Sequence, residues 1–172
     1  MPTQGIIFVR IEGVLASARA LAAAREVNLR SLLDPVALGL LARLCRETGG
    51  AVILAGTLYG RLPAKGSDWQ EFFDSVGFSI PVIDVISEQE GQLDCYEAPY
   101  LKRWFDLDKP SHVVLDCNPA PPPGNLLRWR QVDRLVGLSL CEAIHVLETL
   151  SPQNRDVVQL RLIAADKLTW AG

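Results

Sequence analysis

Short apolar runs that alternate with helical segments constrain the fold of this chain more than any other feature. Three runs, GIIFV, AVIL and HVVL, are continuous, and VIDVI is a weaker fourth. Uninterrupted apolar runs of this length are typical of strands buried on both faces of a parallel sheet. Regular alternation with helices predicts an α/β fold with helices on both faces of that sheet. We therefore expect a Rossmann-like three-layer sandwich with a mainly parallel central sheet.

Capping residues mark the helix boundaries and the domain organisation. Asp34 and Pro35 offer an N-cap followed by proline at the first helical position. Ser139 is a candidate N-cap for the helix that closes the α/β pattern. At 172 residues, one domain is the default. We expect it to span 1–150, with a C-terminal helix in 151–172 packed on the same domain.

Charge and composition exclude several classes of protein. The net charge is −3 and no block of basic residues stands out, which makes nucleic acid an unexpected partner. No apolar run reaches the roughly 18 residues of a membrane span, and the N-terminal residues show no signal-peptide pattern, so we expect a cytoplasmic protein. The cysteines lack CxxC spacing and should be free, mostly buried thiols: Cys45, Cys95, Cys117 and Cys141.

The candidate site follows from the predicted sheet. Open parallel sheets bind ligands outside the carboxyl ends of their strands, where the strand order reverses. The polar residues that follow the apolar runs are Arg10, Glu12, Thr57 and Asp116. These four positions are our candidate site residues.

The residues around the first apolar run resemble a known motif. IIFVRIEGVL is similar to the first motif of the haloacid dehalogenase (HAD) superfamily, an apolar strand followed by Asp-x-Asp-Gly-(Thr/Val)-Leu. In that family the first Asp attacks phosphorus and the second is the general acid and base. This chain has Arg10 at the first position and Glu12 at the second, and it keeps Gly13, Val14 and Leu15.

Further segments follow in the order of that family. AVILAGT resembles the second motif, in which a hydroxyl such as that of Thr57 holds the phosphate. YEAPYLKRWF resembles the third motif of the small capless phosphatases, but Glu97 or Ala98 stands where they have arginine. HVVLDCN resembles the magnesium-binding fourth motif; it keeps Asp116 and has Cys117 where a second acid is frequent. VDRLVGLSLCEAIHVLETL is similar to the closing strand and helix, so the resemblance implies a HAD-like domain with degenerate catalytic motifs.

The substitution at position 10 removes the chemistry that the resemblance implies. Arginine stays protonated, with a pKa of about 12.5 or above, so it cannot attack phosphorus, and its charge repels a magnesium ion. Glu12 keeps a carboxylate but displaces it by about 1 Å, which can cost on the order of 10²-fold in rate. We expect Arg10 to form an ion pair with Glu12 or Asp116. Arg10 is then either an anion hook, which binds a phosphate or another anion, or part of a relic site in which the charges only neutralise one another.

These observations predict a pseudoenzyme, with no intact catalytic residue and no cofactor, that binds a protein partner or a phosphorylated small molecule. The first alternative is a weak phosphohydrolase in which Asp116 and Glu12 hold magnesium and water attacks directly. The second is a regulatory or DNA-associated protein, because the tail 151–172 is faintly similar to the first helix of some helix-turn-helix factors.

That tail is also a possible homodimer surface, and the prolines of 119–123 are either a recognition segment or a loop.

Overall fold

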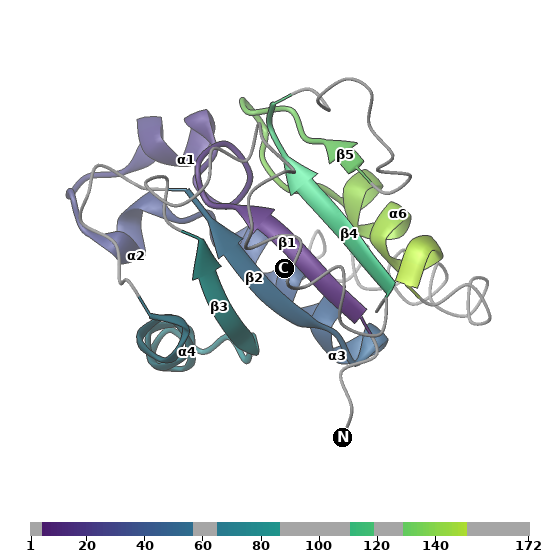
Figure 1. Cartoon of the computed structure of the whole chain (residues 1–172). Helices are drawn as coiled ribbons and strands as arrows, with labels where there is room; N and C mark the ends of the chain where they lie inside the picture. Colours follow the sequence, from purple (N-terminus) through teal and green to yellow (C-terminus); the bar gives the residue numbers. More distant parts are fainter. Residues whose placement is uncertain (1–4, 57–64, 87–110, 119–128, 151–172) are drawn as a thin grey trace, which may run out of the picture.

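The computed structural model describes residues 5–56, 65–86, 111–118 and 129–150 (Figure 1). Its centre is a five-stranded sheet of order β3-β2-β1-β4-β5, in which all pairings between strands are parallel. The order is that of the first five strands of the Rossmann fold. The strands are β1 (Gly5–Arg10), β2 (Ala51–Ala55), β3 (Val82–Ile86), β4 (Ser111–Asp116) and β5 (Trp129–Gln131).

The helices of the described residues begin and end largely where their capping residues predict. They are α1 (Ala18–Ala23), α2 (Leu29–Leu32), α3 (Pro35–Thr48), α4 (Gly66–Ser75) and α6 (Leu140–Leu150). The Asp34 side chain accepts a hydrogen bond from the Val36 amide at 2.9 Å, which caps α3. The helix ends at Gly49, whose φ of 62° lies in the left-handed region that favours glycine. The predicted start of α3 is therefore confirmed.

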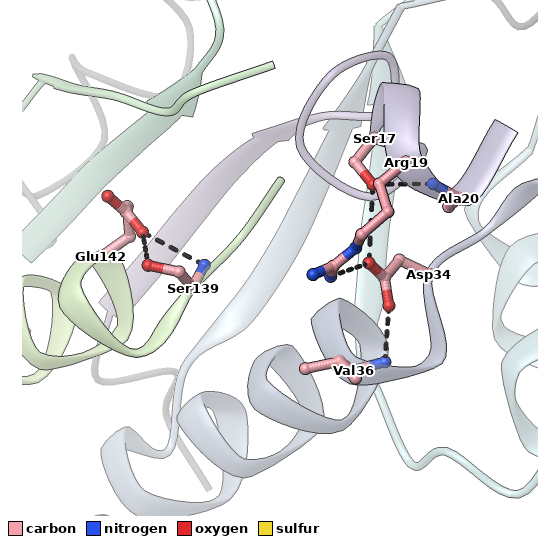
Figure 2. Close-up of polar contacts among 7 residues, drawn as sticks. All are labelled: Ser17, Arg19, Ala20, Asp34, Val36, Ser139 and Glu142. Carbon is pink, nitrogen blue, oxygen red and sulfur yellow. Dashed lines mark hydrogen bonds and ion pairs between the residues drawn. The ribbon is translucent and has the colours of Figure 1, made fainter. Parts of the chain in front are cut away.

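The predicted N-cap of α6 is also confirmed, and it is reciprocal. The Ser139 amide donates to Glu142 Oε2 at 3.1 Å, and the Ser139 hydroxyl contacts the same carboxylate (Figure 2). The Cys141 amide donates to Ser139 Oγ at 3.3 Å. This capping box satisfies backbone donors that the first turn of a helix otherwise leaves unpaired.

Both faces of the sheet are buried. Residues of one face pack with α3, α4 and α6 in the main core: Ile7, Val9, Val52, Leu54, Val113 and Leu115. Alternate residues form a second cluster on the opposite face: Ile6, Phe8, Ile53, Ala55, Ile86 and Val114. The parallel sheet and one helical layer are thus confirmed, whereas a second helical layer is not among the described residues. In Figure 1, α3 and α6 lie together behind the sheet.

Several predicted features fall outside the described ranges. They are the C-terminal helix in 151–172, the proline run 119–123 and the segment that resembles the third motif. In the part of the chain that the structure describes, no helix has both the length and the apolar character to cross a membrane.

The strand order places the switch point beside β1. The chain passes from β1 to β2 and then to β3 on one side of the sheet, and it returns to β4 on the other side of β1. The direction in which strands are added therefore reverses between β1 and β4. A crevice at the carboxyl ends of two such strands is where sheets of this kind bind their ligands.

Candidate functional site

An ion pair between Arg10 and Asp116 bridges this switch point. Val9 and Leu115 are partners in the register of β1 and β4, so the next residue of each strand lies beside the other. Arg10 Nε donates to Asp116 Oδ1 at 2.8 Å. The Asp116 side chain is 1% exposed and the Arg10 side chain 12%. Of the two partners that the sequence predicts for Arg10, Asp116 is therefore the one with which it forms an ion pair.

The surroundings of Arg10 favour its charged form. Burial alone disfavours a buried guanidinium, but the attraction of Asp116 and its hydrogen bond outweigh that effect, with smaller contributions from Cys117 and Glu12. The net result is a raised pKa for Arg10. Only Nε takes part in the pair with Asp116, so that pair leaves the two terminal nitrogens of Arg10 as donors for an anion.

Asp116 holds the loop after β4 as well as the arginine. Its Oδ1 also accepts from the Asn118 amide at 2.8 Å, as a turn-capping aspartate does. Its Oδ2 is buried and has no hydrogen-bond partner among the described residues. A buried carboxylate oxygen without a donor is costly, so Oδ2 can accept a hydrogen bond from a ligand.

Glu12 lies on the other side of the site, against the end of β2. The turn between β1 and α1 is tight, because the amides of Leu15 and Ala16 both donate to the Ile11 carbonyl, at 3.0 and 2.8 Å. A Cβ at Gly56 would lie 2.0 Å from Glu12 Oε2. Gly56 has a φ of 102°, so both its backbone and the neighbouring carboxylate require glycine. Sequence reasoning missed this role of Gly56.

The loops after β1 and β4 touch at a second glycine. Gly13 has a φ of 78°, and a Cβ there would lie 2.8 Å from Cys117 Sγ. The Cys117 thiol donates to the Glu12 carbonyl at 3.5 Å. Burial, and then the charge of Asp116, raise the pKa of the Cys117 thiol, although Arg134 and Arg10 oppose the shift. Cys117 is therefore a packing residue and not an activated nucleophile.

Arg134 is a second cation near this edge, and it was not among the candidate site residues predicted from the sequence. Its Cβ lies 3.2 Å from the position that a Cβ on Gly13 would take, and its charge acts on Cys117. The side chain is exposed. Nothing in the sequence around Arg134 indicates that this residue lies against the loop after β1.

The donor set does not fit a magnesium ion. Magnesium takes six oxygen ligands in near-ideal octahedral geometry, usually including one or two carboxylates. Here one oxygen of Asp116 is committed to a guanidinium 2.8 Å away, and that charge repels a divalent cation. Among the residues that the structure describes, no group of three or more histidine, cysteine or acidic side chains could hold a metal. Thr57, Glu97 and Ala98 lie outside the described residues.

Two of the three cysteines that the structure describes differ from the prediction of mostly buried thiols, and Cys95 lies outside the described residues. Cys45 is buried, but Cys117 is only partly buried and Cys141 is exposed. Cys141 lies in the first turn of α6, on the side of the helix that faces solvent. All three are free thiols.

The chain was also compared with known proteins. No protein-family model, no curated protein and no solved structure matches it.

Proposed function

We propose that this chain is a HAD-like domain that binds a phosphate monoester, carried by a small molecule or by a protein partner, and does not hydrolyse it. The observation that carries the proposal is the pair of Arg10 Nε with Asp116 Oδ1 at 2.8 Å across the switch point of the sheet. The position at which the resemblance implies a nucleophile thus holds a fixed cation. A cation at this edge favours an anionic ligand.

The state of Arg10 argues for binding and against catalysis. Its raised pKa keeps the guanidinium charged, so it has no lone pair with which to attack phosphorus. Guanidinium groups recognise phosphate through paired N–H donors, and the nitrogens of Arg10 that do not bind Asp116 can supply them. Asp116 orients the group from the other side, because it fixes Nε.

The ligand also needs a hydrogen-bond donor. Asp116 Oδ2 is buried without a hydrogen-bond partner in the described part of the chain, and a free phosphate dianion would meet repulsion there. A monoester whose alcohol part carries a hydroxyl or amino group can place its phosphate on Arg10 and its donor at Oδ2. Arg134, on the exposed side, adds a second positive charge near the same edge.

Catalysis is tested with p-nitrophenyl phosphate and magnesium, using the natural chain beside Arg10→Asp. We expect no turnover by the natural chain, because it lacks a nucleophile. Gain of activity in Arg10→Asp would support an eroded phosphatase pocket. Activity of the natural chain that is lost in Asp116→Asn would overturn the proposal and favour the hydrolase that uses metal-activated water.

Binding is tested by NMR titration of the labelled chain with O-phosphoserine, which carries both a phosphate and an amino donor. We expect amide shifts in the loops after β1 and β4, and their loss in Arg10→Gln. Arg46→Gln is the matched control, since Arg46 is an exposed arginine of α3 whose partner is Glu47. Equal binding by the natural chain and Arg10→Gln would rule out Arg10 as the anion hook.

A further inference from the structure

A hollow of about 590 Å³ lies between α1, the α2 segment and the first turn of α3. Its volume is within the range of about 300–1,000 Å³ that is usual for small-molecule sites. Figure 1 shows α1 and α2 beyond the carboxyl ends of β2 and β3. The floor is apolar and made mostly of small side chains: Ala20, Ala23, Ala24, Leu33, Pro35 and Val36.

The polar residues of the hollow carry an excess of positive charge. Arg19, Arg25 and Asp34 all line it, which gives two positive charges against one negative. Asp34 is already committed: its Oδ2 accepts from Arg19 Nη2 at 2.8 Å and from Ser17 Oγ at 3.5 Å, and its Oδ1 caps α3 (Figure 2). The acid therefore cannot serve as a site for a cationic ligand.

Arg25 is the cation of the hollow whose charge no ion pair offsets within the described part of the chain. It is exposed and has no ion-pair partner among the described residues. Arg19 uses Nη2 for Asp34, while its side chain remains 60% exposed. A second hollow of similar volume lies between α3 and residues 77–81, but there Arg46 pairs with Glu47. The hollow beside α1 thus combines an apolar floor with a guanidinium that has no ion pair to any described residue.

From this combination we infer a second binding site, independent of the phosphate site proposed above. The hollow binds a small amphipathic anion, whose flat apolar part lies on the alanine floor and whose carboxylate or sulfonate pairs with Arg25. Alanine methyl groups leave a shallow surface, which a planar ring or an extended chain can cover. Removal of that apolar surface from water supplies the attraction, and the arginine selects the charge.

The test uses 2-naphthoate as the probe and 2-naphthol as its uncharged counterpart, each titrated into the labelled full chain by NMR. We expect amide shifts that cluster in α1, α2 and the first turn of α3. Naphthoate should bind about two- to fivefold more tightly than naphthol, as expected for one exposed ion pair. Arg25→Gln should remove that preference and leave naphthol binding unchanged.

Two further variants complete the experiment. Ala23→Leu adds a larger side chain at the floor without changing the charge, and it should weaken both probes. Arg46→Gln, in the other hollow, should change neither. Three results would each overturn the inference. The natural chain could bind the two probes equally, Arg25→Gln could keep the full preference for naphthoate, or the amide shifts could cluster around residues 77–81.

Discussion

Replacement of Asp116 by alanine should lower the stability of the domain by about 3 kcal/mol. Loss of one partner of a buried ion pair costs about 3–5 kcal/mol, because the other charge is left uncompensated. Two features of the site adjust that value. Arg10 keeps 12% of its side chain exposed and stays near Glu12, which lowers the cost, whereas the Asn118 amide loses its 2.8 Å acceptor, which raises it by about 1 kcal/mol.

Urea unfolding measures this loss, with the fluorescence of the buried Trp69 as reporter. A change of about 3 kcal/mol corresponds to about 6–12 °C in Tm for a domain of this size. The double variant Arg10→Met with Asp116→Ala separates the pair from local effects, because it removes both charges of the pair together. We expect it to be at least about 1.5 kcal/mol more stable than the sum of the single changes predicts. A loss below about 0.5 kcal/mol in Asp116→Ala, or strict additivity, would refute the reasoning.

Three other predictions concern stability, measured as urea midpoints. Gly56→Ala should cost about 2–3 kcal/mol of stability, because a left-handed backbone is strained for alanine and the Glu12 side chain must move. Gly77→Ala is the control, since Gly77 has a φ of 88° and open space around it, so that variant should show the backbone strain alone. Equal losses in the two variants would contradict the close approach of Glu12 to Gly56. Ser139→Ala should cost about 1 kcal/mol through loss of the α6 capping box, and an unchanged midpoint would count against that cap. Burial raises the pKa of the Cys45 thiol from 9.0 to about 12, so the stability that the neutral thiol contributes is complete below pH 9 and is lost as the pH rises towards 12. Over that window, Cys45→Ala should lose less stability than the natural chain. Curves of stability against pH that run parallel for the two proteins would disprove this prediction.

The elements of the sheet were readable from the sequence, because a strand buried on both faces requires an unbroken apolar run. GIIFV and HVVL mark β1 and β4 within one residue of their observed bounds. The caps of α3 and α6 were readable for a similar reason, since each satisfies local backbone donors. The rule that polar residues gather at the carboxyl ends of parallel strands predicted Glu12 or Asp116 as the partner of Arg10, but not which of the two.

Other features depend on contacts that no local pattern encodes. The strand order is one, because an apolar run does not specify which strand will lie beside it. The approach of Glu12 to Gly56 is another, since it depends on the path of the turn after β1. The hollow beside α1 likewise forms only when three short segments meet, and the alanines of its floor looked in the sequence like ordinary helix formers.

The central place of β1 also affects how the chain folds during synthesis. β1 must pair with β4 on one side, and the residues that join across this pair are 106 positions apart in the chain. At about 5–20 residues per second, the ribosome needs roughly 5–20 s to make that stretch. Until then, β1 can pair only with β2, and the unpaired amides and carbonyls on its other edge can form hydrogen bonds with a strand of another chain. We expect the closing of this edge by β4 to be a late step in folding, with the half-built sheet as the species most open to aggregation or chaperone binding.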